Sequence, residues 1–356
     1  MENEVLNSGV TSKRFACLIG SPWFWLVILL LAVLASLLTG AYPMPPSLSL
    51  QIFIDWLWIF DGSVWDAWNW KDVSVMTVIR PPRILVATCA GIVLGLAGAS
   101  LQGIMRNPLV SPDLVGVSSG AAFGGVLALI VGGPSIFVMG LAFLGGMLAL
   151  ACTFSLANLM GVRSDGLGLI LAGFFVGAFF LAGVGLCLYL GPNGSAPDIV
   201  YWMLGSFRGA DPQKLWIIGL SVLFGGSVLI GLRWRINLLS LGDLDAAALG
   251  INIRRLRWTV ITVVAWLVAS QVAVSGVIGW VGLIVPHVAR MLVGPDHRRL
   301  LPASAFIGGL LVLGLDDFTR SVVRGEIPVS VLSALAGTPF ICFLFWKSQT
   351  KGWSEQ

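Results

Sequence analysis

Long stretches of this chain contain no charged residue, and this feature restricts its fold more than any other. Residues 15–54, 114–162 and 258–289 hold no Asp, Glu, Lys or Arg. Of the 356 residues, 57% are hydrophobic and only 11% are charged, whereas charged residues make up about a quarter of an average soluble protein. A soluble domain of this size needs more polar surface, so the sequence disfavours soluble enzymes, nucleic-acid-binding proteins and disordered proteins.

The length of the apolar runs indicates helices that cross a membrane. A bilayer core is crossed by about 20 apolar residues in helical form, whereas an outer-membrane barrel has alternating strands of about ten residues. The sequence therefore predicts an all-α, polytopic membrane protein, with residues 1–356 forming one transmembrane domain. Ten spans are expected near residues 22–40, 82–104, 114–131, 137–159, 167–190, 215–232, 258–275, 279–292, 301–318 and 328–346. The eighth is short and can also be a half-helix buried among its neighbours.

The distribution of basic residues predicts the orientation of the chain. With ten crossings and a cytoplasmic N-terminus, 14 basic residues lie inside and 7 outside, which together make the 21 Lys and Arg of the chain. This excess follows the positive-inside rule and favours cytoplasmic N- and C-termini. Outside, the Trp-rich segment 41–79 is expected at the membrane interface, with ligand stacking as the alternative. Small residues at Gly91, Gly95 and Ala99, and at Gly173 and Gly177, predict closely packed helices.

Several kinds of chemistry have no signature in this sequence. It contains no G-x-x-x-x-G-K-[ST] motif for ATP phosphates, and neither of its two histidines belongs to an H-E-x-x-H motif. No catalytic residue, metal ligand or cofactor site is therefore expected. The pair Asp316-Asp317 lies near the outer end of the ninth span, with Arg320 one turn away, so we interpret it as structural. Intramembrane ionisable residues are otherwise scarce, which disfavours a proton- or sodium-coupled transporter.

Three polar segments rich in Gly or Pro lie on the predicted cytoplasmic side: residues 102–120, 242–257 and 276–302. In the second, the alanines after Gly242 can form a short helix that ends at Gly250. A short exposed helix flanked by arginines suits docking into the groove of a partner. A solvated loop that obeys the positive-inside rule is the alternative.

Motifs in these segments resemble the FecCD-type family, the permease subunits of bacterial ABC importers for iron chelates, haem and cobalamin. The matching residues run in order from about residue 20 to 346. They are Arg80-Pro-Pro-Arg83, Gln102-Gly103, Arg106-Asn-Pro-Leu109, Gly116-Val-Ser-Ser-Gly120, Gly242 with Ala246 and Leu249-Gly250, Gly282-Leu283, Pro286-His287, Arg290, Asp296-His-Arg298, Asp316 to Arg320, Ile327-Pro328 and Gly337-Thr-Pro-Phe340. The chain departs from the family pattern at Trp280, where Phe is usual, and at Ser330, where Gly is usual.

The resemblance implies a ten-helix permease of a type II ABC importer in the bacterial inner membrane, not an enzyme. It implies a second permease subunit, identical or different, two cytoplasmic ATPase subunits that hydrolyse the ATP, and a periplasmic substrate-binding protein. The segment at about 240–257 would couple to the ATPase, through Gly242, Leu244, Ala246, Leu249, Gly250, Arg254 and Arg255. Ala246 is expected to enter a groove of the ATPase.

Two further sites are expected on this basis. Arg80, Arg83 and Arg320 lie outside, against the positive-inside bias, and are expected to form salt bridges with the binding protein; headgroup binding or snorkelling is the alternative. Asp165 and Gly166, between the fourth and fifth spans, are expected to form the cytoplasmic gate, with a plain loop as the alternative.

Iron(III)–siderophore is the leading substrate class, because a mostly apolar, Gly-rich lining suits a bulky chelate. Haem and cobalamin follow within the same family. An ion-coupled secondary transporter is the alternative from another class, and a membrane-integral enzyme is disfavoured because His, Asp and Glu clusters are missing.

Overall fold

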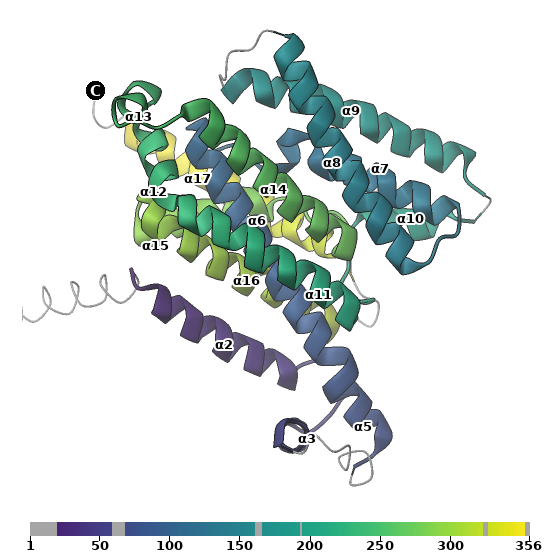
Figure 1. Cartoon of the computed structure of the whole chain (residues 1–356). Helices are drawn as coiled ribbons and strands as arrows, with labels where there is room; N and C mark the ends of the chain where they lie inside the picture. The colour runs from purple at the N-terminus through teal and green to yellow at the C-terminus, as the bar shows by residue number, and fades with distance from the viewer. Residues whose placement is uncertain (1–19, 59–67, 161–165, 193, 323–326, 353–356) are drawn as a thin grey trace, which may run out of the picture.

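The computed structural model describes residues 20–58, 68–160, 166–192, 194–322 and 327–352. Within these ranges the chain is helical, with no strand. Figure 1 shows most helices running roughly parallel or antiparallel to one another, with the short α3 seen end-on at one extremity. The all-α fold expected from the apolar runs is therefore confirmed.

Each of the ten predicted spans coincides with an apolar helix. In the described part of the chain, six helical stretches are long and apolar enough to cross a membrane, and four shorter apolar helices accompany them. The ten are α2 (Pro22–Leu38), α6 (Arg80–Met105), α7 (Val117–Ile130), α8 (Ser135–Leu159), α9 (Gly166–Leu190), α11 (Pro212–Ser221) continuing into α12 (Ser227–Leu241), α14 (Ile253–Ser275), α15 (Val281–Val293), α16 (His297–Val322) and α17 (Val329–Gly352). Two π-helical turns, η1 (Val75–Ile79) and η3 (Val222–Gly226), lie within the long stretches 70–105 and 212–241.

The helices form two neighbouring groups in Figure 1. One group holds α7, α8, α9 and the short α10 (Ala196–Met203), and the other surrounds α6. Helix α14 packs against α6 on one side and against α8 on the other, so it joins the groups. The main hydrophobic core follows α6 and α14, whose buried side chains include Val93, Leu101 and Leu267.

Glycines let α6 approach α15 and α16 at backbone distance. A Cβ atom at Gly91 would lie 2.1 Å from the carbonyl oxygen of Gly308, and one at Gly98 would lie 1.9 Å from that of Gly282. Gly173 on α9 is equally close to the carbonyl oxygen of Leu114, at 2.3 Å. The close packing predicted from the spacing of small residues is confirmed at Gly91 and Gly173, and Gly98 adds a contact that was not predicted.

Glycines also end helices where the sequence suggests a break. Gly132 has φ 72° between α7 and α8, and Gly276 has φ 74° after α14. The segment 276–280 is irregular, and the short α15 begins after Trp280, which has φ 69°. The eighth predicted span is thus a 13-residue helix, as its length suggested.

The structure differs from the sequence prediction in three places. The outer segment 41–79 contains α3 (Pro46–Trp58) and α5 (Trp70–Ser74), and α5 continues through η1 into α6. Helix α10 follows α9, where a loop was expected. The sixth span extends to Leu241, so Arg233 and Arg235 lie on α12 and not in a loop. Helices α5 and α10 are short and leave no long apolar run in the sequence, whereas most of α3 lies in the uncharged run 15–54 behind the first span.

Candidate functional site

The segment 242–257 contains a short helix, α13 (Asp243–Ala248), between α12 and α14. Gly242 (φ 156°) precedes α13 and Gly250 (φ 78°) follows it. The amide of Gly250 donates to the carbonyl oxygen of Ala247 at 2.9 Å, and that of Ile251 donates to the carbonyl oxygen of Ala246 at 3.0 Å. These bonds satisfy the last carbonyls of the helix, as expected for a glycine-terminated helix.

The two faces of α13 differ in exposure. Leu244 is 88% exposed and Leu249 63% exposed, and Ala248 is also exposed. Ala246 is fully buried in the main core of this chain. The expectation that Ala246 enters a groove of another subunit is therefore corrected: its methyl group packs inside the permease, because it lies on the face of α13 that turns back to the helices.

Asp243 connects α13 to two spans. Its carboxylate accepts hydrogen bonds of 2.8 and 3.1 Å from Nη2 of Arg257 on α14, and Nη2 of Arg106, just after α6, lies 3.4 Å from Oδ1. The Arg257 side chain is almost fully buried and also donates from Nε to the carbonyl oxygen of Ile104, at 3.4 Å. Asp243 was not among the predicted site residues; its position beside Gly242, with arginines nearby in sequence, is the signal that could have identified it.

The segment after α6 folds around its own polar groups. Arg106 takes the left-handed conformation, with φ 50°, at the end of α6. Ser118 Oγ donates to Asp113 Oδ1 at 2.6 Å; burial raises the pKa of the Asp113 carboxyl, and this hydrogen bond opposes the shift. Nη2 of Arg290 on α15 donates to Oε1 of Gln102 at 3.0 Å, so the first and third predicted segments meet.

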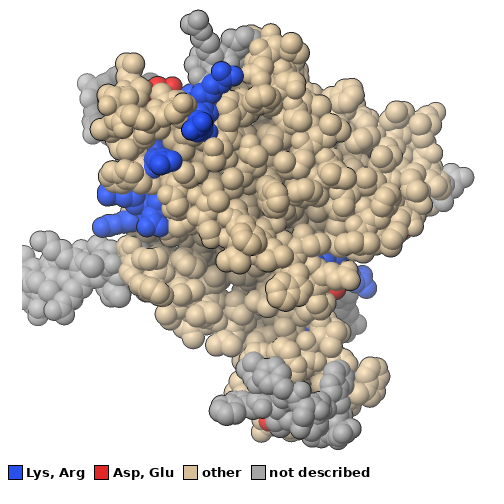
Figure 2. Space-filling model, viewed as in Figure 1, with Lys and Arg blue, Asp and Glu red and all other residues tan. Residues whose placement is uncertain are grey.

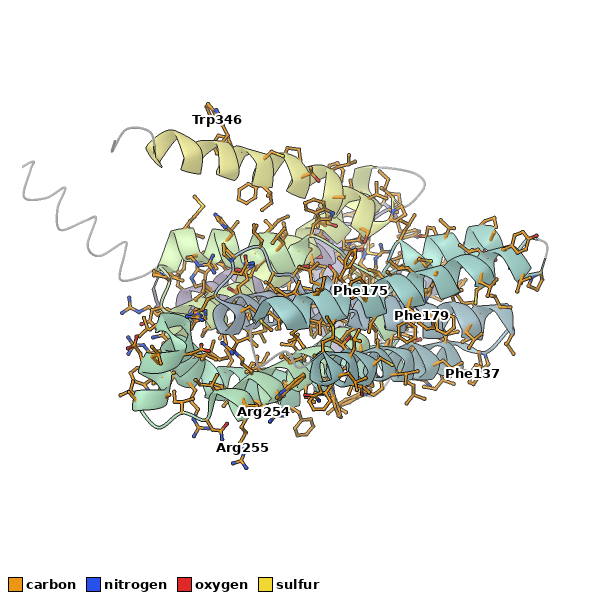
Figure 3. The ribbon with its side chains drawn as sticks, turned by 90° about the horizontal axis from the view of Figure 1, so that it is seen from above. Phe137, Phe175, Phe179, Arg254, Arg255 and Trp346 are labelled. Atoms are coloured by element: carbon orange, nitrogen blue, oxygen red, sulfur yellow. The ribbon has the colours of Figure 1, made fainter. Side chains whose placement is uncertain are left out.

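The end of the molecule that carries α13 is basic. Figure 2 shows Lys and Arg gathered at the end where α12 and α13 lie, while most of the same face has no charge. In Figure 3, Arg254 and Arg255 lie toward this end and Phe137 toward the opposite one. Arg298 donates hydrogen bonds of 3.0 and 2.8 Å from Nε to Asp296, which lowers the pKa of that carboxyl. This end is the predicted cytoplasmic side.

The predicted gate is only partly within the described residues. Asp165 lies outside them, and Gly166 begins α9. The following helix presents apolar side chains to its outside, with Phe174 60%, Phe175 50% and Phe179 74% exposed. Figure 3 shows Phe175 and Phe179 on this helix.

At the opposite end, a buried ion pair joins α6 to α16. Arg83 donates to Asp316 from Nε (3.0 and 3.1 Å) and from Nη2 (2.8 Å), a two-pronged contact that suits the planar guanidinium. Asp316 is fully buried, and Nε of Arg320 lies 3.6 Å from its Oδ2 atom. This arrangement agrees with the structural interpretation of the Asp316-Asp317 pair.

The other two outer arginines hold the end of α2. Arg80 donates to the carbonyl oxygens of Leu37 (2.6 Å) and Tyr42 (3.0 Å). Arg320 bonds Asp317 and donates to the carbonyl oxygens of Ser36 (3.0 Å) and Thr39 (3.2 Å). The last carbonyls of a helix have no partner within it, so the arginines supply the donors that α2 lacks.

This geometry bears on the expectation that Arg80, Arg83 and Arg320 form salt bridges with the binding protein. All three are buried, with 4%, 9% and 5% of their surface exposed. They lie together at one end of the bundle, as predicted, but their guanidinium groups bind atoms of this chain. Their partners are up to 284 residues away in sequence, which is why the contacts could not be read from local spacing. Whether a binding protein reaches them stays a prediction.

No group of three or more His, Cys, Asp and Glu side chains lies close enough to hold a metal ion in the part of the chain that the structure describes. The described site residues form ion pairs and pack between helices.

Comparison with known proteins places this geometry among transport permeases. The model of the FecCD transport family matches residues 28–347. The molybdate import system permease protein MolB of Haemophilus influenzae is 44% identical over 285 residues, which cover 79% of this chain and 84% of the relative. The hemin transport system permease protein HmuU of Yersinia pestis is 34% identical over 334 residues, covering 92% and 95%.

A solved structure is also similar over nearly its whole length. It is described as a metal-chelate type ABC transporter in an inward-facing conformation, and it superposes with a TM-score of 0.80 at 38% identity. The match covers 92% of this chain and 98% of the solved chain.

Proposed function

This chain belongs to the FecCD transport family of ABC importer permeases, and from this premise we propose that it carries a metal-containing solute from the periplasm to the cytoplasm. It is a transport subunit and not an enzyme, and it lies in the membrane as a multi-pass protein. ATP hydrolysis belongs to a separate ATPase subunit. In our proposal the functional unit holds two permease subunits, two ATPase subunits and a periplasmic binding protein, and both ends of this chain are cytoplasmic.

The observation that carries the proposal is the arrangement of α13. Its exposed Leu244 and Leu249 offer apolar contacts to an ATPase, with Arg254 and Arg255 beside them on α14. Asp243 ties the same helix to Arg106 after α6 and to Arg257 on α14. A displacement of α13 by the ATPase would therefore move the ends of two spans together, as in rigid helix shifts at an interface.

The gate is proposed at Asp165 and at Gly166, the first residue of α9. The apolar outer face of α9 could contact either lipid or a second permease copy on the other side of the solute pathway. Cysteines at these two positions should cross-link between permease copies in at least one nucleotide state. Failure to cross-link in every nucleotide state would place the gate elsewhere.

Docking of the binding protein is proposed at the end that carries α3 and α5. Arg83 and Arg320 are buried, so they would stabilise this surface without contacting the binding protein. Exposed side chains such as Arg208 would make the direct contacts. Charge reversal at Arg208 should slow docking at low salt, because exposed charges act mainly on encounter rate. Charge reversal at Arg83 would instead break a buried pair and disturb the fold.

For the solute we propose an iron(III) chelate, such as a siderophore complex, as the leading class. Support comes from the apolar exterior of α9 and from the iron chelatin, hemin and cobalamin permeases among the relatives. Molybdate is a second candidate, because the MolB relative is 44% identical to this chain. A molybdate pathway would have to accept a small, strongly hydrated dianion in place of a bulky chelate.

Uptake into proteoliposomes tests both the proposed ATP-driven transport and the proposed class of solute. The chain is reconstituted with its own ATPase and binding protein, and labelled ferric siderophore, haem, cobalamin and molybdate are supplied in turn with internal ATP. We expect ATP-dependent uptake of one class, lost when a non-hydrolysable analogue replaces ATP. Uptake driven by a proton or sodium gradient without ATP would establish a secondary transporter and refute the proposal.

A further inference from the structure

A cavity of about 470 Å³ lies beside α13, between α12 and the start of α14. Its apolar wall includes Leu232, Leu238 and Leu256. Its polar lining includes Arg235 and Arg255, one from each helix. The cavity thus combines two cationic side chains with an aliphatic surface.

The two arginines have no acidic partner among the residues that the structure describes. In the described part of the chain no carboxylate lies within ion-pair distance of either guanidinium, and both residues are exposed. Two carboxylates of neighbouring segments are engaged elsewhere: Asp243 pairs with Arg106 and Arg257, and Asp296 pairs with Arg298. Asp245 on α13 is exposed and, among the described residues, is not within ion-pair distance of either arginine. Two like charges on one cavity repel each other, so an anion between them would be stabilised.

The position along α12 indicates the membrane interface. Phe224 (65%) and Val228 (41%) are exposed on the apolar part of this helical stretch, and Trp234 (52%) follows two turns later. The guanidinium of Arg298 lies over the Trp234 ring, 5.0 Å from its centroid. Tryptophan and basic residues are typical of the level at which acyl chains give way to headgroups.

We propose that this cavity binds an anionic phospholipid of the cytoplasmic leaflet. The guanidiniums of Arg235 and Arg255 would pair with its phosphate, since arginine binds phosphate with two parallel hydrogen bonds. Arg255, Leu249 and Gly250 line the cavity and also belong to the proposed coupling segment, so the lipid would lie at the edge of the ATPase contact. The glycerol and acyl groups would cover Leu232 and Leu238. The cytoplasmic leaflet carries negative lipids, so the ligand is present where the cavity opens. Free phosphate shares the headgroup chemistry but leaves the aliphatic wall uncovered.

Native mass spectrometry of the purified permease, titrated with phosphatidylglycerol or phosphatidylcholine, tests the proposal. We expect phosphatidylglycerol to bind more tightly than phosphatidylcholine, and Arg235→Gln to weaken phosphatidylglycerol binding about tenfold, the loss typical of a hydrogen bond to a charged group. Arg233→Gln is the matched control. Arg233 is exposed on the same helix but does not line the cavity, so this variant should bind as the parent does. Equal elution volumes in size exclusion show that both variants are folded.

Three results would overturn the proposal. Equal weakening in the two variants would show a general basic surface and no site. Displacement of the lipid by millimolar inorganic phosphate would show that the cavity selects a free anion. Loss of bound lipid in the assembled importer, with a cross-link from position 235 to the ATPase, would show that the ATPase covers the cavity. Retention of phosphatidylglycerol by the whole importer supports the lipid site.

Discussion

Single residues in this chain act mainly in two ways: glycines lack the side chain that would keep helices apart, and polar side chains form buried contacts between helices. Glycines on α6 remove the side chains that would separate it from α15 and α16, so carbonyl groups lie where Cβ atoms would be. Ser330, a departure from the family pattern, donates from Oγ to the carbonyl oxygen of Val277 at 2.7 Å. That bond ties α17 to the irregular segment before α15, a contact that a glycine could not make.

A methyl group at Gly98 should destabilise the fold. In Gly98→Ala the new Cβ would lie 1.9 Å from the carbonyl oxygen of Gly282, so the two helices must separate, at a cost of about 1–3 kcal/mol. Gly140→Ala is the control, because Gly140 lies in α8 with no atom within 4 Å of the added Cβ; there alanine should be neutral or stabilising by up to about 1 kcal/mol. Thermal unfolding in detergent compares the two, and equal midpoints would contradict the close contact.

Neutralising Asp316 should remove the buried carboxylate that the Arg83 guanidinium contacts through Nε and Nη2. We expect Asp316→Asn to lower stability by about 3–5 kcal/mol, the usual loss when one partner of a buried pair is removed. Asp198→Asn is the control, because Asp198 is exposed on α10. Replacing both partners, in Arg83→Met with Asp316→Leu, should recover part of the loss, as measured by detergent thermal stability. No recovery in the double variant would indicate a role beyond the ion pair.

Among the elements, α13 has two faces that make different contacts. Ala246 packs inward, Asp243 binds the two neighbouring spans, and Leu244 points away from the core. The short helix itself was predictable from the alanine run and the glycines. Which residues face inward was not, because six residues give too few turns to establish a periodic pattern.

Variants of α13 should separate docking from transmission. Leu244→Glu places a charge on the exposed apolar contact and should abolish co-purification of the ATPase, while Leu244→Met should preserve it. Asp243→Asn removes the ionic contact to Arg257 and should keep the ATPase bound while reducing ATP-driven uptake about tenfold or more. Uptake and ATPase activity, measured on the same proteoliposomes, distinguish the two effects. Normal uptake in Leu244→Glu would show that α13 is not part of the coupling site.

For the whole molecule, the sequence predicted the number and place of the apolar helices, because each one needs a long uncharged run. It did not predict α3, α5 or α10, which have 13, 5 and 8 residues and do not reach the length of a membrane span. The outer arginines lie together at one end of the bundle, as predicted, but the sequence did not show their partners within the chain. Arg83 meets Asp316 across 233 positions, and only the folded helices bring such residues together.

The predicted orientation is open to a labelling experiment. In a cysteine-free background, a single cysteine at Gly194 should react with a membrane-impermeant maleimide added to intact cells or spheroplasts. A single cysteine at Gly250 should react only after the membrane is opened. Both glycines have open space where a side chain would stand, but their φ values of 95° and 78° strain the backbone of any other residue, so size exclusion checks that each variant is folded. The reverse pattern would place both termini outside.

The continuous helical stretch from Trp70 to Met105 has a consequence for the height of the outer surface. Its 36 residues give about 54 Å at 1.5 Å per residue, whereas the hydrocarbon core is about 30 Å thick. Even tilted, this rod projects beyond the bilayer, and Figure 1 shows α5 and α3 extending past the ends of the other helices. A large protein that approaches from that side contacts the protruding helix end before it reaches the membrane surface. It therefore has to bind next to this protrusion or have a concave surface that accommodates it.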